Sequence, residues 1–234
     1  MTEAESYITG ELHGKLDFLT DCMTEQQRRA LLGSVTLTEC GKGVCLYTAG
    51  NVPTDLKLLV SGKCVVYIDG VSGRRQIVRL VSEGSITGCR EYFSNSNYTE
   101  TVLAIESSVV ANIPFSVIDE IMNENHALAG VFLRIMSEEL ELAYTKTISL
   151  TQKHIRGRMA EGLLWLADTF GYCDDGATLA AVMSRAQIAS LTNMITSNAI
   201  RTLSAFAAEG LVELRGKNIV ILNKVKLANL SRKG

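Results

Sequence analysis

The chain of 234 residues carries 23 Lys or Arg against 25 Asp or Glu, and 47% of its residues are hydrophobic. This length and apolar content predict a folded protein of one or two domains and exclude a disordered chain. No run of eighteen or more apolar residues occurs, and the acidic start "MTEAESYITGELHG" lacks the basic and apolar regions of a secretory signal. We therefore expect a cytoplasmic protein with no membrane partner. The six cysteines form no CxxC pair, which indicates reduced and mostly buried thiols.

Charge is distributed unevenly along the chain. Residues 153–234 hold eleven Lys or Arg and six Asp or Glu, whereas residues 1–152 hold twelve and nineteen. A basic C-terminal third favours a polyanionic partner for that part, although a solvated surface produces the same imbalance.

Residues 35–113 are short β-type runs separated by glycines. The stretch "KLLVSGKCVVYID" predicts a hairpin with Ser61-Gly62 as its turn, and "GRRQIVRLVSEGSITG" and "TVLAIESSVVANIP" add further strands. Strands this short, with turns every eight to twelve residues, predict a small antiparallel barrel or roll.

A helical pattern begins at Asn125, which suits a helix cap, and predicts one helix over about residues 126–152. Such a helix is about 40 Å long, which is more than a small roll covers. It is either an ordinary core helix or a dimer seam. We favour the seam, formed by Leu128, Phe132, Ile135 and Leu142.

The C-terminal third predicts three further helices and a hairpin. "RMAEGLLWLADTFG" is typical of an amphipathic helix that ends at Gly171. In "SRAQIASLTNMITSNAIRTLSAFAAEG", Ser184 and Gln187 form a capping-box pattern, Asn193 suits a tight turn, and Thr196 begins a second short helix. "GLVELRGKNIVIL" predicts a β-hairpin with a basic tip. Together these elements indicate a winged helix-turn-helix, with an unrelated helical pair as the alternative.

The second short helix has two contrasting faces. Ala199, Leu203 and Phe206 have core spacing, whereas the opposite face carries one charge, several hydroxyls and an isoleucine. That face is poorly suited to water but suits a DNA major groove, where Arg201 can pair with guanine. Ser184 and Arg185 are placed for phosphates. Arg185 and the two basic residues at the hairpin tip are alternatively solvated surface charges. The expected DNA-binding residues are Ser184, Arg185, Thr196, Ser197, Asn198, Ile200, Arg201, Arg215 and Lys217.

The chain resembles the Crp/Fnr transcription regulators, the relatives of the cyclic-AMP receptor protein. "LVSGKCVVY", "RRQIVRLVSEGSITG" and "SRAQIASLTNMITSNAIRTLSAFAAEGLVELRGKNIVI" carry the resemblance, which covers nearly the whole chain. It implies an α+β fold: an antiparallel β-roll of the cyclic-nucleotide-binding, jelly-roll type over residues 1–125, a dimerisation helix over 126–152, and a winged helix-turn-helix over 153–234. It also implies a cytoplasmic homodimer that binds two-fold symmetric double-stranded DNA, answers a small effector or redox signal, and has RNA polymerase as a partner.

The expected effector pocket departs from the family pattern. Cyclic-nucleotide-binding members hold the ribose with a Gly-Glu pair and the phosphate with an Arg-Ser or Arg-Thr pair. Here Cys89 follows Gly88, and Tyr98-Thr99 stand at the phosphate-binding positions; Arg90 is nearby but out of place. Losing the cation removes a charge-assisted hydrogen bond worth about 1.5–3 kcal/mol. The resemblance therefore implies a pocket of these five residues that does not take cyclic AMP. In the second short helix, Thr196-Ser197 replace the Arg-Glu or Val-Glu of many relatives, and Arg201 matches the usual guanine reader.

The cysteines and histidines bear on which cofactors the chain can hold. Iron–sulfur members need closely spaced N-terminal cysteines, and Cys22 alone lies in that region, so no cluster is expected. Haem stays open, with the scattered His13, His126, His154 and the cysteines as candidate ligands. Cys40, Cys45 and Cys89 are expected to be small buried hydrophobes, with a redox switch as the alternative.

Two other classes of function compete with DNA-binding regulation. One is a signalling module with a degenerate helix-turn-helix that does not bind DNA. The other is a cupin-like enzyme, which is disfavoured because residues 15–125 contain no histidine for a metal site. No catalytic motif or phosphate-binding glycine loop occurs. We therefore expect no enzyme activity, no catalytic residues and no metal.

Overall fold

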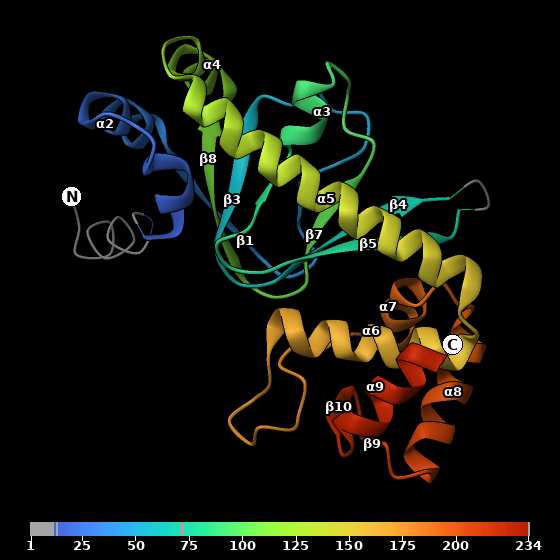
Figure 1. Cartoon of the computed structure of the whole chain (residues 1–234). Helices are drawn as coiled ribbons and strands as arrows, with labels where there is room; N and C mark the ends of the chain where they lie inside the picture. Colours follow the sequence, from blue (N-terminus) through green and yellow to red (C-terminus); the bar gives the residue numbers. More distant parts are fainter. Residues whose placement is uncertain (1–11, 13, 71–72, 234) are drawn as a thin grey trace. The chain divides into compact units, whose positions relative to one another are not determined.

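The computed structural model describes residues 12, 14–70 and 73–233 (Figure 1). Packing divides the chain into two compact units, which are described in turn. The first comprises Met1–Cys64 and Val81–Leu142, and the second comprises Val65–Leu80 and Ala143–Gly234. The functional division expected at residues 125 and 152 stays a prediction.

Two four-stranded sheets form the antiparallel β-roll that the sequence predicts. The strand order is β1-β8-β3-β6 in one sheet and β2-β7-β4-β5 in the other. In the first sheet, β8 lies between β1 and β3 and pairs antiparallel with both. The strand bounds are β1 (Thr36–Cys40), β2 (Cys45–Tyr47), β3 (Asp55–Ser61), β4 (Cys64–Asp69), β5 (Arg75–Val81), β6 (Ile86–Thr87), β7 (Thr101–Ala104) and β8 (Ser108–Pro114).

The predicted hairpin around Ser61-Gly62 is wrong. β3 pairs with β6 and β8, whereas β4 belongs to the other sheet, so this turn passes between sheets. Gly62 has φ +97°, and a Cβ there would lie 2.3 Å from Ser108 Oγ and 2.6 Å from Ser107 O. The glycine is therefore needed for a close backbone approach, in addition to its positive φ.

The described part of the first unit contains helices that were not predicted, among them α2 (Glu25–Ser34), α3 (Cys89–Phe93) and α4 (Phe115–Glu124). α2 begins at a capping box in which the Thr24 side chain accepts from the Gln27 backbone and the Gln27 side chain accepts from the Thr24 backbone. This pattern was readable in the sequence. α4 follows directly on β8, so no loop marked its start; it buries Phe115, Ile118 and Ile121.

The long helix α5 (His126–Gln152) has the predicted bounds, and Asn125 Oδ1 accepts from the Ala127 backbone at 3.1 Å. The seam assigned to it needs correction, however. Leu128 and Phe132 are 1% and 3% exposed and belong to the core of the first unit, and Ile135 packs against that core. This stripe is used within the protomer, because α5 covers its own core with it. Leu142 is half-buried.

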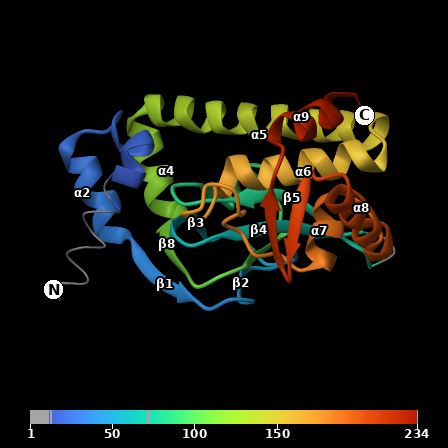
Figure 2. The same cartoon turned by 90° about the horizontal axis from the view of Figure 1, so that it is seen from below.

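The second unit contains a winged helix-turn-helix (Figure 2), as predicted. α6 ends next to Gly171, which closes the helix through its backbone N–H to Ala167 O. α9 was not predicted, and it packs along α6. The bounds are α6 (Ile155–Phe170), α7 (Arg185–Leu191), α8 (Thr196–Ala208), β9 (Val212–Arg215), β10 (Asn218–Ile221) and α9 (Lys224–Lys233).

Candidate nucleic-acid interface and effector pocket

α7 starts at the predicted capping box. Ser184 Oγ accepts from the Gln187 backbone N–H at 3.1 Å, and Gln187 Oε1 accepts from the Ser184 N–H at 2.8 Å. These bonds satisfy helix-terminal donors and fix where the helix begins. Ile188, Ala189 and Leu191 then point into the core of the domain. The Ser184 hydroxyl proton can still be donated to an acceptor such as a phosphate oxygen.

The turn between α7 and α8 is held in place by α6. Asn193 has φ +52°, the left-handed conformation that asparagine adopts more readily than most residues. Arg158 donates from Nε to Thr192 O at 3.2 Å, and its other guanidinium nitrogens bond further backbone carbonyls, including Asn193 O. Sequence reasoning missed Arg158, because nothing local connects residue 158 with a turn 35 positions later. Its hydrogen bonds tether the α7–α8 turn to α6.

α8 has the two faces that the sequence predicts. Ala199, Leu203 and Phe206 are each 0% exposed and anchor the helix in the domain. The opposite face is exposed, and Asn198 is half-buried at its edge. A helix that presents hydroxyls, one guanidinium and an aliphatic chain at its N-terminal half has the groups that read base edges in a major groove. The exposed residues of this face are Thr196, Ser197, Ile200, Arg201 and Ser204.

Arg185 connects α7 to the wing, the β9–β10 hairpin. Its NH2 group donates to Gly216 O at the hairpin turn at 2.7 Å. Its NH1 atom is buried and has no hydrogen-bond partner in the described residues. The side chain therefore positions the wing next to the N-terminus of α7. Contact of Arg185 with a DNA phosphate stays a prediction.

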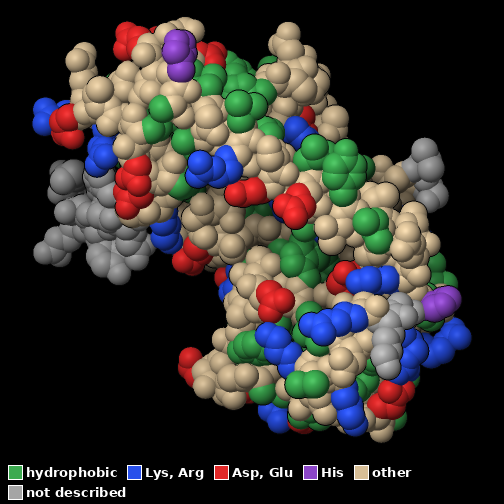
Figure 3. Space-filling model, in the orientation of Figure 1, with side chains coloured by type: hydrophobic (Ala, Val, Ile, Leu, Met, Phe, Trp, Pro, Cys, Tyr) green, Lys and Arg blue, Asp and Glu red, His purple; other side chains and the backbone are tan. Residues whose placement is uncertain are grey.

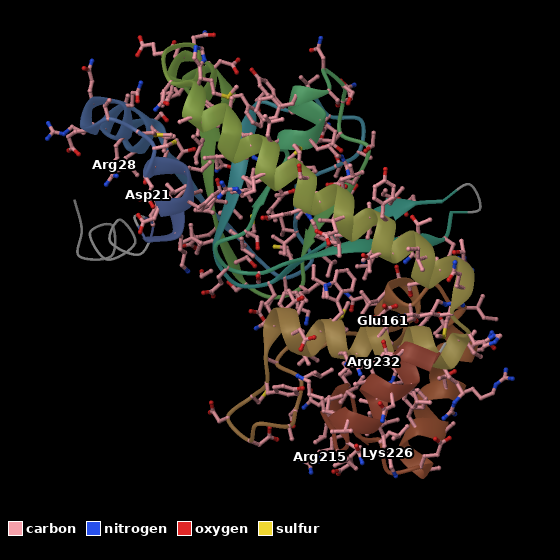
Figure 4. The ribbon with its side chains drawn as sticks, in the orientation of Figure 1. Asp21, Arg28, Glu161, Arg215, Lys226 and Arg232 are labelled. Atoms are coloured by element: carbon pink, nitrogen blue, oxygen red, sulfur yellow. The ribbon has the colours of Figure 1, made fainter. Side chains whose placement is uncertain are left out.

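The two basic residues at the wing tip differ from one another. Arg215 donates to both carboxylate oxygens of Glu213, from Nε at 2.8 Å and from NH2 at 2.9 Å. This pair engages the Arg215 guanidinium, whereas Lys217 is exposed on the turn. Arg215 lies at the lower edge of the domain in Figure 4, and Lys and Arg side chains gather over the same unit in Figure 3.

In the first unit, an aromatic side chain occupies the position where the family pattern expects the phosphate-binding arginine. Tyr98 is 4% exposed and stacks on Tyr47, with ring centroids 3.8 Å apart and an angle of 14°. Gly88 has φ +94°, and a Cβ there would come within 3.0 Å of the Tyr98 hydroxyl. Burial and the neighbouring carboxylates raise the pKa of Tyr98, so its hydroxyl stays neutral.

Beside this stack lies an acid cluster, which we define as Glu91, Glu100 and Arg90. Both carboxylates are buried, at 2% and 5% exposure, and Arg90 NH2 donates to Glu91 Oε1 and, at 2.8 Å, to Glu100 Oε2. Thr99 Oγ1 also donates to Glu91 Oε1, at 2.9 Å. Burial opposes ionisation of Glu91, but the hydrogen bonds and charge of Arg90, with Thr99, hold its pKa below the ordinary value.

Of the five expected pocket residues, the structure groups Arg90, Tyr98 and Thr99 around these acids. Gly88 leaves room for Tyr98, since a Cβ at Gly88 would lie 3.5 Å from the Tyr98 Cε1 atom, and Cys89 is 1% exposed in the core. Sequence reasoning missed Glu91 and Glu100, because the family pattern places neither at a ligand-binding position. Their spacing on either side of the turn at 94–98 gave no direct signal.

Helix α3 also connects the acid cluster to the long helix of the same unit. The Tyr92 ring stacks on Phe115 of α4 at 3.8 Å, and its hydroxyl donates to the Asp119 carboxylate. The neighbouring Phe93 meets Phe132 of α5 edge-on at 5.0 Å. A shift of α3 would therefore change its packing against α4 and α5.

The cysteines and histidines differ in burial across the part of the chain that the structure describes. Cys40, Cys64 and Cys89 are buried; burial raises the pKa of Cys40 and raises that of Cys64 to about 12, which disfavours the reactive thiolate. Cys22 and Cys45 are half-buried and Cys173 is exposed, so burial is less general than expected. His126 and His154 are exposed, and His13 lies outside the described residues. No three potential ligands converge, and no helix there is long and apolar enough to cross a membrane.

A polar, exposed α8 beside a basic hairpin defines a DNA-binding protein of the winged helix-turn-helix class. The Crp-like helix-turn-helix domain model matches residues 157–230, and the cyclic nucleotide-binding domain model matches residues 37–125. The chain belongs to the Crp/Fnr family of DNA-binding transcription regulators.

Relatives and solved structures agree with this assignment. The chain is 27% identical over 187 residues to the electron transport regulator A of Shewanella oneidensis, covering 80% of this chain and 74% of that protein. It is 26% identical over 193 residues to the fumarate and nitrate reduction regulatory protein of Escherichia coli K12, covering 81% and 76%.

Two solved structures share the fold. The first is a Crp/Fnr-family regulator from Eubacterium rectale, with a TM-score of 0.77 at 20% identity over 92% of this chain and 97% of that one. The second is FixK2 from Bradyrhizobium japonicum, with a TM-score of 0.75 at 22% identity over 84% and 96%. At these identities the structures establish the fold alone.

Proposed function

We propose that the chain works as a homodimer that reads a two-fold symmetric operator through α8 and is controlled by a signal sensed in the β-roll. The observation that carries the proposal is the exposed face of α8, where Arg201 stands among hydroxyls while the opposite face is fully buried. The degenerate-module alternative is disfavoured, because such a protein has no need to keep this face polar and uncovered. A gel shift with promoter fragments separates the two functions: the proposal expects a salt-sensitive shifted complex, and the alternative expects none.

The proposed dimer contact is a second apolar stripe on α5, distinct from the one buried in the protomer. Leu133, Leu140, Tyr144 and Ile148 are 69%, 53%, 64% and 54% exposed. Spacings of seven, four and four place them on one helix face, and hydrophobic side chains follow the course of α5 in Figure 3. A second copy of α5 would cover this stripe, as in a coiled coil.

The seam is tested by replacing Leu140 and Tyr144 with Asp and measuring the mass by sedimentation. Removing two large apolar contacts from each protomer should raise the dimer dissociation constant at least about 1000-fold. Glu138→Lys, an exposed change on another face of the helix, is the control and should leave the dimer intact. A double variant that stays dimeric would place the seam elsewhere.

We propose that the signal is not a cyclic nucleotide. A phosphodiester at the expected position would meet the buried Tyr98 ring and the Glu91 and Glu100 carboxylates, where cyclic-nucleotide-binding relatives offer a cation. Calorimetry with cyclic AMP and cyclic GMP should show no submillimolar binding. A redox signal is the second candidate, favoured by the names of relatives such as the electron transport regulator and an anaerobic regulatory protein.

The remaining partners follow from family membership. We propose that the protein acts in the cytoplasm, contacts RNA polymerase when bound at its operator, and catalyses no reaction. Pull-down of purified RNA polymerase on operator DNA, with and without the chain, tests this contact.

A further inference from the structure

One carboxylate oxygen of the acid cluster lacks a hydrogen-bond donor. Glu91 Oε1 accepts from Arg90 and Thr99, Glu100 Oε2 accepts from Arg90, and Glu100 Oε1 accepts from the Tyr47 hydroxyl at 3.2 Å. Glu91 Oε2 is the carboxylate oxygen of this cluster that is buried without a hydrogen-bond partner among the described residues. A buried charged oxygen without a donor is costly, so this position favours a bound group that donates.

The net charge of the cluster indicates whether the bound group is a cation or an anion. Two buried carboxylates face one guanidinium, and the Arg90 side chain is itself 47% exposed to solvent. The cluster therefore has an excess of buried negative charge. The stacked rings of Tyr98 and Tyr47 lie alongside it, and ring faces attract cations. An anion at this position would be repelled.

We propose that the β-roll binds a small primary amine in its ammonium form, with an ammonium N–H donating to Glu91 Oε2 and the charge balanced by Glu91 and Glu100. An ammonium supplies both the donor and the positive charge. A divalent metal ion needs several converging oxygen ligands, and no group of three potential ligands lies among the described residues. The proposal deepens the proposed function, because it names the effector class for the roll and rests on the roll being the sensing domain.

Binding here would be transmitted through α3. Glu91 and Arg90 lie on the same five-residue helix as Tyr92 and Phe93, which contact Phe115 and Phe132. An ammonium that fixes Glu91 would therefore also fix α3 against α4 and α5.

The test is calorimetry and thermal unfolding of the full chain with methylammonium or 1,4-diaminobutane. Tetramethylammonium chloride at equal ionic strength is the matched control, since it carries the charge but has no N–H to donate. We expect saturable binding and a raised melting temperature with at least one primary amine, and neither effect with the control.

Glu91→Gln should weaken the binding of the amine about 10- to 100-fold, which is the value of one charge-assisted hydrogen bond. Glu106→Gln, which removes a half-exposed carboxylate paired with Lys63 in the same unit, should bind like the wild type.

Three results would overturn the proposal: no saturable binding of either amine below about 10 mM, which corresponds to a binding free energy too weak for a specific site; equal effects of tetramethylammonium; or unchanged binding by Glu91→Gln. If Glu91→Gln does not fold, the comparison of the amines with tetramethylammonium on the wild type still decides. A gel shift on the same preparations keeps the two proposals apart. Loss of amine binding with intact DNA binding rejects this proposal alone, whereas amine binding without any DNA complex rejects the proposed function alone.

Discussion

The exposed face of α8 and the acid cluster of the β-roll use similar side chains in opposite ways. On α8, Arg201 is exposed among hydroxyls, and the apolar side of the helix does all the anchoring. In the roll, Arg90 bridges two buried carboxylates through hydrogen bonds from its NH2 group. An arginine can bind a ligand when no carboxylate of its own protein engages it. An arginine next to buried carboxylates instead stabilises the fold.

The largest effect is expected for Arg201→Ala. Loss of a forked contact to guanine should cost about 1–3 kcal/mol per half-site and relax the preference at one base position. Competition gel shifts with operator and scrambled DNA measure both quantities. Lys226→Ala, which removes an exposed charge from α9, is the control and should leave base preference unchanged. An equal loss on operator and scrambled DNA would show that α8 is not the reading helix.

This contrast also explains how far the sequence could be interpreted. In the helix-turn-helix, each determinant is local: Ser184 and Gln187 cap one helix, Asn193 makes the turn, and the spacing of Ala199, Leu203 and Phe206 sets the buried face. These features are within about a turn or two of each other along the chain, so the pattern predicted them correctly.

The roll depends on contacts between distant residues, and there the sequence was less informative. The sequence pattern predicts Gly62 in a hairpin turn, but a glycine is required there because Ser108 on another strand leaves no room for a Cβ. Leu128 and Phe132 looked like a seam, because periodicity shows that a stripe is apolar and not which surface covers it. Glu91 and Glu100 are nine positions apart, and only the fold brings both onto Arg90.

Removing Arg90 should show that it is part of the scaffold. Arg90→Met leaves two buried carboxylates uncompensated and should lower the free energy of unfolding by about 1–3 kcal/mol. This is less than for a fully buried pair, because the Arg90 side chain is half-exposed. Urea unfolding of the variant beside Arg29→Met, whose partner Glu25 is exposed, measures the difference. Equal stabilities would mean that Arg90 is as available as Arg201.

The two basic residues of the wing test the same difference, with a smaller expected effect on DNA binding. Because Glu213 engages Arg215 through two bonds, Glu213→Gln should free positive charge and steepen the salt dependence of DNA binding by up to about one unit per half-site. Lys217→Ala should make the same slope shallower by about one unit per contact removed. Titration of binding against salt concentration measures both. A Glu213→Gln slope equal to that of the wild type would show that Arg215 contacts no phosphate.

A further expected effect is a change in pH dependence from a half-buried lysine of the second unit. Lys146 lies over the Trp165 ring at 3.2 Å and donates to Val78 O. Burial lowers its pKa to about 7, opposed by the charge of Glu161. Between that pKa and the ordinary value of 10.5, the unfolded chain binds more protons, so stability should rise with pH across this window.

Lys146→Met should remove this contribution and flatten the stability profile between about pH 7 and pH 10. Thermal unfolding at a series of pH values measures it. An unchanged slope in the variant would show that the cation over Trp165 keeps an ordinary pKa.

A two-fold dimer that reads DNA through α8 should select symmetric sites from random double-stranded DNA. We expect two identical half-sites in inverted orientation, with centres about 34–36 Å apart, and a preferred guanine that loses its enrichment when the selection is repeated with Arg201→Ala. Failure to enrich any sequence, or enrichment of a single asymmetric site that Arg201→Ala leaves unchanged, would contradict DNA reading by such a dimer.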